Sequence, residues 1–208
     1  MLIDRLVEQH RPTPPHRLPR RIAVSTLLGA AIILALVVTW GIRPNIAASS
    51  ATLRFWVKLG FGAGFAITGF TGLLALFRPE RPAPRRLWFA AIPIAVIAAA
   101  AFNEIATVSD AELTALWLGK SALACPFAIV ALSAFPSYAL IQAGRRSAPT
   151  RLRLTGGVIG LTSSGLAAML YALHCPENGM TFVATWYSVG VMLATLVGII
   201  CGPRLLRW

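Results

Sequence analysis

The chain has 208 residues, of which 57% are hydrophobic and only 12% are charged, and its mean hydropathy is +0.71. Soluble domains usually carry roughly 25% charged residues, so this composition excludes an ordinary water-soluble domain. The net charge of +12 would indicate a nucleic-acid partner in a soluble protein. Here the positions of the basic residues favour a membrane protein that does not bind nucleic acid directly.

Six apolar stretches predict membrane-spanning helices. A bilayer core of roughly 30 Å needs about 20 apolar residues in helical conformation. Stretches of about that length cover residues 22–42, 53–77, 87–106, 116–142, 155–174 and 181–201. We therefore expect an all-α integral membrane protein with a six-transmembrane-helix bundle over residues 22–201, preceded by a tail of residues 1–21 and followed by a tail of residues 202–208. The first stretch is longer than the apolar core of a signal peptide, so we interpret it as a span.

The basic residues are distributed unevenly along this topology. The N-terminal tail, the second and fourth connections and the C-terminus together hold 15 of the 19 Lys and Arg side chains. Basic residues near the ends of spans stay in the cytoplasm, so both termini are predicted to be cytoplasmic. The four basic residues expected on the outer side are Arg43, Arg54, Lys58 and Lys120.

Small residues at helical spacing predict close contacts between helices. These residues are Gly60 and Gly64 in the second stretch and Gly156, Gly160 and Ser164 in the fifth. Such spacings let membrane helices approach closely. We interpret them as packing within one chain in preference to a homo-oligomer contact, since small residues line most helix contacts in membranes.

Two cysteines that are distant in sequence are predicted to lie at the same depth. Cys125 falls in the outer part of the fourth stretch, and Cys175 falls where the fifth stretch emerges on the outer side. Each is followed by a proline. Pro126 is expected to kink its helix and Pro176 to prevent the fifth helix from continuing, and both effects should expose a thiol to water. Such a pair can switch between thiols and a disulfide, or bind a thiophilic metal. The alternative is that both are small buried hydrophobes.

Several polar residues are predicted to support the cysteine pair. His174 and Glu177 flank Cys175, and Glu104 and Lys120 lie near outer helix ends. Cys125, Cys175 and His174 form a candidate metal-binding set. An ion pair from Glu104 to Lys120 or Lys58 is an equally good interpretation, because charged residues in membranes are costly unless they are paired or hydrated. The acidic residues Asp110 and Glu112 are expected in a short outer loop, and Cys201 is expected to have only a packing role.

The N-terminal tail carries one short apolar face. Leu2, Ile3, Leu6 and Val7 have the spacing of one helix face, and four prolines follow within residues 12–19. One or two helical turns are marginal in water, so we expect this segment to fold only against a partner. The membrane surface and a groove on another protein both fit this pattern.

The sequence resembles a known family around the second cysteine. The segment YALHCPE at residues 171–177, followed by FVATWY at residues 182–187, is similar to the signature of the NrsF family, whose members are negative regulators of sigma factors. The resemblance extends over nearly the whole chain. It includes the leucine- and proline-rich leader and residues 43–44, 55–59, 119–125, 148–151 and 205–208.

This resemblance implies a function. It implies an anti-sigma factor of the bacterial inner membrane that holds an extracytoplasmic-function sigma factor inactive until an external stress is sensed. The two characteristic cysteines of the family correspond to Cys125 and Cys175, which implies that they sense oxidative or heavy-metal stress. A thiophilic metal ion would then be a signal, with no obligatory cofactor and no enzymatic activity. Sigma-factor binding would fall on the apolar tail residues Leu2, Ile3, Leu6 and Val7, together with the cytoplasmic loops.

Two other classes of function are alternatives to this one. A small metal or solute transporter or channel would use Glu104, His174 and the cysteines as an entry site, but the spans have few polar residues near the membrane midplane. A membrane thiol oxidoreductase would be expected to carry a CxxC motif, which the sequence lacks.

Overall fold

The computed structural model describes residues 17–78, 84–147 and 149–207, and these ranges contain helices and turns but no strand. The described elements, in chain order, are α2 (Arg17–Trp40), α3 (Ile46–Ser50), α4 (Leu53–Leu76), the 3₁₀ turn η1 (Arg85–Ala90), α5 (Ala91–Thr107), α6 (Asp110–Leu118), α7 (Ala124–Arg145), α8 (Leu152–Tyr171), α9 (Met180–Phe182), the π turn η2 (Val183–Tyr187) and α10 (Ser188–Leu205). The apolar tail residues Leu2, Ile3, Leu6 and Val7 lie outside the described residues.

Six helical segments are long and apolar enough to cross a bilayer. They are α2, α4, η1 with α5, α7, α8, and the continuous run from α9 through η2 to α10. The all-helical class and the number of long apolar helices predicted from the sequence are therefore confirmed for the described residues.

The predicted fourth span was wrong at its start. Residues 110–118 form a separate helix, α6, so Asp110 and Glu112 lie in its first turn and not in a loop. Gly119 follows with a φ of +52°, a left-handed conformation that ends α6 and that other residues rarely adopt. The span itself begins at Ala124. The prediction from hydropathy merged the end of α6 with α7 into one stretch because α6 also ends in apolar residues.

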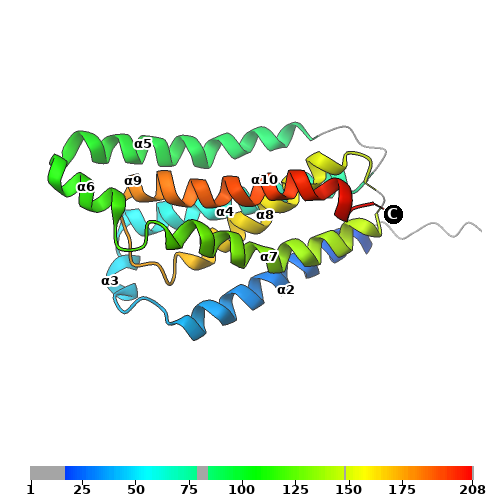
Figure 1. Cartoon of the computed structure of the whole chain (residues 1–208), viewed down its shortest axis with the longest axis horizontal. Coiled ribbons are helices and arrows are strands. Elements are labelled where there is room, and N and C mark those ends of the chain that lie inside the picture. Colours follow the sequence, from blue (N-terminus) through cyan, green and yellow to red (C-terminus); the bar gives the residue numbers. More distant parts are fainter. Residues whose placement is uncertain (1–16, 79–83, 148, 208) are drawn as a thin grey trace, which may run out of the picture.

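Helix α8 lies at the centre of the bundle, because most of its residues are buried, whereas α2 and α5 keep most of their surface exposed. Figure 1 shows α5 along one side of the molecule and α2 along the opposite side, with α7, α8, α4 and α10 between them. The exposed faces of these outer helices are rich in large apolar side chains, among them Leu27 and Leu28 of α2 and Ile92 and Phe102 of α5. Exposed apolar surface of this extent is typical of helices that face lipid.

Glycines hold α8 against its neighbours. A Cβ atom at Gly156 would overlap the carbonyl oxygen of Gly198, and one at Gly160 would lie 2.5 Å from the carbonyl oxygen of Ala194. The fifth-stretch glycines therefore pack within the chain against α10, as predicted. The second stretch differs, because a Cβ at Gly60 would meet nothing within 4 Å.

The contact between α4 and α8 uses other glycines. A Cβ atom at Gly62 would lie 2.5 Å from the backbone nitrogen of Met169, and one at Gly165 would lie 2.5 Å from that of Ala66. Gly64 faces Pro93 of α5 instead. Sequence spacing identified the type of contact but not which glycines of α4 make it.

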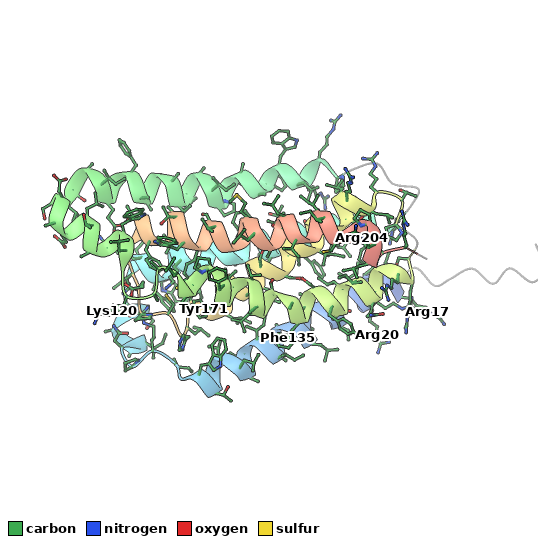
Figure 2. All side chains as sticks on the ribbon, in the orientation of Figure 1. Arg17, Arg20, Lys120, Phe135, Tyr171 and Arg204 are labelled. Carbon is green, nitrogen blue, oxygen red and sulfur yellow. The ribbon has the colours of Figure 1, made fainter. Side chains whose placement is uncertain are left out.

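Arginine side chains are concentrated at one end of the long axis of the bundle. Figure 2 shows Arg17, Arg20 and Arg204 toward one end and Lys120 at the other. Twelve arginines of the described residues belong to the helix ends and connections of the first end, which we call the arginine end: Arg17, Arg20, Arg21, Arg78, Arg85, Arg86, Arg145, Arg146, Arg151, Arg153, Arg204 and Arg207. The opposite end, which we call the cysteine end, carries both Cys125 and Cys175.

Candidate functional site

The two predicted cysteines meet at the cysteine end of the bundle. Their Sγ atoms are 3.6 Å apart, and both thiols are free. Cys125 is the second residue of α7, and Cys175 lies in the connection between α8 and α9. A disulfide bond has a length of about 2.05 Å, so a small approach of the two sulfur atoms would allow one to form.

The expected exposure of these thiols was wrong. Cys125 and Cys175 are both 0% exposed. Pro126 is only the third residue of α7, where a missing N–H leaves no helical hydrogen bond unmade, so it starts the helix and does not kink it. Both thiols belong to the apolar core, together with buried side chains that include Tyr171, Met180 and Tyr187.

The Cys125 side chain is surrounded by hydroxyl groups. Its Sγ atom is 3.3 Å from Ser121 Oγ and 3.7 Å from Tyr171 Oη. The first contact follows from helical spacing, because Ser121 precedes Cys125 by one turn and its carbonyl oxygen accepts the Cys125 N–H at 2.9 Å. The Tyr171 contact joins α8 to α7 and places a polar atom directly beside the thiol pair.

Arg43 fixes the backbone that carries Cys175. This guanidinium is 2% exposed, and its Nη1 atom donates to the carbonyl oxygen of Cys175 at 3.2 Å and to Asn178 Oδ1 at 2.9 Å. Its Nη2 atom donates to the carbonyl oxygen of Pro176, and its Nε atom to Asn45 Oδ1, both at 2.9 Å. One side chain thus satisfies four acceptors, which suits the fixed donor geometry of arginine.

Lys58 also binds the 172–179 connection. Its side chain is 0% exposed, and Nζ donates to the carbonyl oxygens of Cys175 at 3.2 Å and Glu177 at 2.8 Å. Nζ also lies 4.9 Å from the centre of the Tyr187 ring, within the range of a cation–π interaction. A buried ammonium group is costly unless it is hydrogen-bonded, so these carbonyl contacts explain how α4 tolerates it.

The interpretation that paired Glu104 with Lys58 or Lys120 was therefore wrong. Glu104 is 1% exposed and lies 3.0 Å from Nη1 of Arg54, which is half-exposed. Its other carboxylate oxygen accepts hydrogen bonds from the backbone N–H and the hydroxyl group of Thr181, at 2.8 and 2.9 Å. Glu104 therefore joins α5 to α4 and α9 beside the cysteine site but does not contact the thiols.

Glu177 and Lys120 do meet, through the backbone. The Lys120 N–H donates to Glu177 Oε1 at 2.8 Å, while the carboxylate lies directly over Gly119. A Cβ atom at Gly119 would be 2.7 Å from the Glu177 carboxyl carbon, so glycine leaves space for the carboxylate as well as allowing the positive φ. The pair links the connection after α8, which carries Cys175, to the connection before α7, the helix that carries Cys125.

The contacts of His174 are with neighbours other than the two cysteines. Its Nδ1 atom is 2.7 Å from the carbonyl oxygen of Gly41, and its ring packs edge-on against Trp40 at 5.9 Å between centroids. Across the described ranges, no three His, Cys, Asp or Glu side chains are grouped closely enough to hold a metal ion. The structure thus brings together two members of the candidate metal-binding set but not the third.

Tyr187 and Arg43 are parts of the site that the sequence interpretation missed. Tyr187 is 0% exposed, ends the π turn η2, and packs against Tyr171 with ring centroids 6.2 Å apart. Such π turns inside helices are often found at functional sites. A signal for Arg43 was present, because it is one of only four basic residues assigned to the outer side.

Cys175 lies outside the six long helices, and its surroundings favour the thiolate. The hydrogen bond with Cys125 lowers the pKa of the Cys175 thiol below its ordinary value of 9.0, and the positive charge of Lys58 acts in the same direction, while burial opposes both. The thiolate is the form of cysteine that attacks oxidants and binds metals. Cys175 is therefore the candidate reactive thiol of the pair.

The fold and this site define a class of protein: a bundle of six long apolar helices with a buried thiol pair at one end. Comparison with known proteins identifies the family. The NrsF family, described as "Negative regulator of sigma F", matches residues 6–208, and the chain belongs to it.

Two relatives support this assignment. The chain is 38% identical over 214 residues to the anti-sigma-F factor NrsF of Caulobacter vibrioides, an alignment that covers 100% of this chain and 98% of that protein. It is 32% identical over 170 residues to the probable anti-sigma-F factor NrsF of Azospira oryzae, covering 80% of this chain and 78% of that protein. No solved structure matches the chain.

Proposed function

We propose that this chain is an anti-sigma factor of the bacterial inner membrane that holds an extracytoplasmic-function sigma factor inactive in the cytoplasm. The names of the two relatives and the description of the family support the anti-sigma role. The arginine end would face the cytoplasm with both termini, since basic residues near the ends of spans are retained there. The role is regulatory, with no reaction catalysed and no obligatory cofactor.

The Cys125–Cys175 pair is the proposed stress sensor. The observation that supports this most directly is the 3.6 Å separation of two free thiols that lie 50 residues apart, at the end of the bundle opposite the arginines. Disulfide formation would remove two electrons and two protons from the pair and pass them to an oxidant on the outer side. A thiophilic metal ion as signal would instead displace the thiol protons and bind both sulfur atoms.

The burial of the thiols implies how the signal arrives. An oxidant or metal ion would reach the sulfur atoms when the 172–179 connection opens, and the hydrogen bonds from Arg43 and Lys58 to that connection would set how often this happens. Closing the bridge would then hold the start of α7 against the end of α8. Helix α7 runs from Ala124 to Arg145 and has Cys125 as its second residue, so it would carry a shift at one end to the other.

The energy available is sufficient for release. A tenfold weakening of sigma-factor affinity requires about 1.4 kcal/mol of difference between the two helix arrangements. A disulfide typically contributes about 2–4 kcal/mol, part of which would be expressed as this difference.

The test is capture of sigma factors from native cytoplasm by the detergent-solubilised chain, with and without residues 2–9. Under reducing, metal-free conditions the intact chain should retain one sigma factor, and the shortened chain should not, because the apolar tail is the proposed docking segment. If neither form retains a sigma factor, the anti-sigma proposal fails.

The sensor is tested on the same captured complex. Peroxide or a thiophilic metal ion should release at least tenfold more sigma factor from the parent chain than from a Cys125→Ser/Cys175→Ser variant. Cys201→Ser is the matched control, because Cys201 lies near the opposite end of the bundle, and it should respond like the parent. Normal release from the double variant would overturn the sensing role and leave the anti-sigma role intact.

A further inference from the structure

An open cavity of about 420 Å³ lies at the arginine end, between the first turns of α2 and the last turns of α7. Four of the residues that line it are arginines: Arg17, Arg20, Arg21 and Arg146. Figure 2 shows Arg17 and Arg20 at this end of the bundle, beyond Phe135 of α7. The site and the proposed sensing mechanism make no use of this cavity.

No carboxylate among residues 17–78, 84–147 and 149–207 lies near these arginines. The four acidic residues in these ranges are Glu104, Asp110, Glu112 and Glu177, and all of them belong to the cysteine end. Retention of basic residues in the cytoplasm explains why arginines gather at this end. It does not explain why four of them surround a single cavity, where their mutual repulsion favours a bound anion.

The cavity also has an apolar part. Val24 of α2 and Ala139 and Ala143 of α7 contribute it, and the remaining lining residues are the neutral polar Ser25 and Gln142. Beneath it the two helices touch, because a Cβ atom at Gly29 would overlap the ring of Pro136. The cavity therefore ends within the bundle and does not continue as a channel.

The surface beside the cavity continues the apolar character toward the middle of the spans. Val24, Leu27 and Leu28 of α2 are 45%, 68% and 58% exposed, and Tyr138 of α7 is 68% exposed. A ligand that fits must carry negative charge at the level of the arginines and hydrocarbon at the level of these side chains. A free anion would leave the apolar part unfilled, and an acidic protein segment would not extend into the plane of the spans.

We infer that this cavity binds the phosphate headgroup of an anionic phospholipid, with an acyl chain lying along the exposed apolar faces of α2 and α7. Guanidinium groups bind phosphate oxygens through paired hydrogen bonds. Basic pockets between helices on the cytoplasmic side of membranes suit such headgroups. The inference rests on the membrane insertion of the proposed function but not on the anti-sigma role.

The test compares two double variants of the full chain that lose the same charge. Arg20→Gln/Arg146→Gln changes the cavity, whereas Arg151→Gln/Arg153→Gln removes two exposed arginines of the same end that do not line it. Binding of phosphatidylglycerol to each detergent-solubilised protein is measured by native mass spectrometry, with phosphatidylcholine as the uncharged comparison. The cavity variant should lose about tenfold in phosphatidylglycerol affinity beyond the loss in the control, the effect of one charge-assisted contact.

Other outcomes assign the cavity differently. Equal losses in the two variants would show that only net charge matters, and would overturn the inference. Displacement of phosphatidylglycerol by millimolar inorganic phosphate would indicate a site for free anions, and would also overturn it. Loss of sigma-factor capture by the cavity variant in lipid-free detergent, with phosphatidylglycerol binding unchanged, would assign the cavity to a protein partner.

Flotation with vesicles separates this inference from the proposed function. The parent and both variants should float to the same extent with phosphatidylglycerol vesicles, because the six apolar helices insert regardless of these arginines. Failure of all three to float would count against membrane insertion itself. A selective loss of lipid affinity in the cavity variant, with flotation intact, supports the site.

Discussion

Positively charged side chains have opposite environments at the two ends of the bundle. At the cysteine end, Arg43 and Lys58 are almost fully buried, and their hydrogen bonds go to carbonyl and amide oxygens of the connections that they hold. At the arginine end, Arg17, Arg20 and Arg146 are exposed around an open cavity. The first arrangement stabilises a fixed structure around the thiols, whereas the second leaves charge available for a ligand from outside the chain.

This difference predicts where a charge matters for stability. Loss of a buried, multiply bonded cation leaves several acceptors without a partner, and such losses cost several kcal/mol. Loss of an exposed arginine usually changes stability by less than about 0.5 kcal/mol. Stability measurements can therefore separate the structural charges of one end from the binding charges of the other.

The largest effect is expected for Arg43→Ala. It removes the partner of three groups in the 172–179 connection, the carbonyl oxygens of Cys175 and Pro176 and the side chain of Asn178. We expect a loss of about 3–5 kcal/mol in the free energy of unfolding. Denaturant unfolding in detergent micelles measures it. Arg153→Ala, at an exposed position of the arginine end, is the control and should behave like the parent.

Arg43→Ala should also change the reactivity of the site. With the connection released, Cys125 and Cys175 should react with a maleimide faster than in the parent, in which both thiols are buried. Cys201 labelling should be unchanged. Equal stability and equal labelling in Arg43→Ala and Arg153→Ala would contradict the distinction between the two ends.

A second, smaller effect is expected for the packing of α8 against α10. In Gly156→Ala the new methyl group would overlap the carbonyl oxygen of Gly198, forcing α8 and α10 apart at a cost of about 1–3 kcal/mol. Gly60→Ala is the matched control, since its methyl group would meet nothing within 4 Å. Thermal unfolding of the two variants should move in opposite directions, because alanine favours helix over glycine at an uncrowded position.

The smallest effect is expected for Arg54→Ala. Its guanidinium is half-exposed, and the Glu104 carboxylate keeps two hydrogen bonds from Thr181 when Arg54 is removed. We expect a loss of about 1 kcal/mol, the upper end of the usual range for an exposed ion pair, because the Glu104 side of this pair is buried. Glu104→Ala should cost more than Arg54→Ala in the same unfolding assay, because it leaves the Thr181 donors without a partner. The reverse order would show that the ion pair, and not the hydrogen bonds, stabilises this corner.

Much of the architecture follows from the sequence alone. Six apolar stretches correspond to the six long helices, and the uneven distribution of arginines separates the two ends. These features depend on the composition of stretches of about 20 residues, which decides whether a helix is apolar enough to span a bilayer whatever its tertiary contacts are. The meeting of Cys125 and Cys175 followed from the same topology, because both positions were assigned to one depth.

The environment of the cysteines was decided by tertiary structure. Their burial depends on contacts between residues far apart in sequence. The same is true of the hydrogen bonds from Arg43 and Lys58 to one connection, and of the ion pair between Glu104 and Arg54. A buried cation must find acceptors wherever the fold places them, and here they are backbone carbonyl oxygens, which have no sequence signature. The sequence by itself thus determined which segments form the long apolar helices and which end is basic, while only the folded chain decided that the thiols are enclosed.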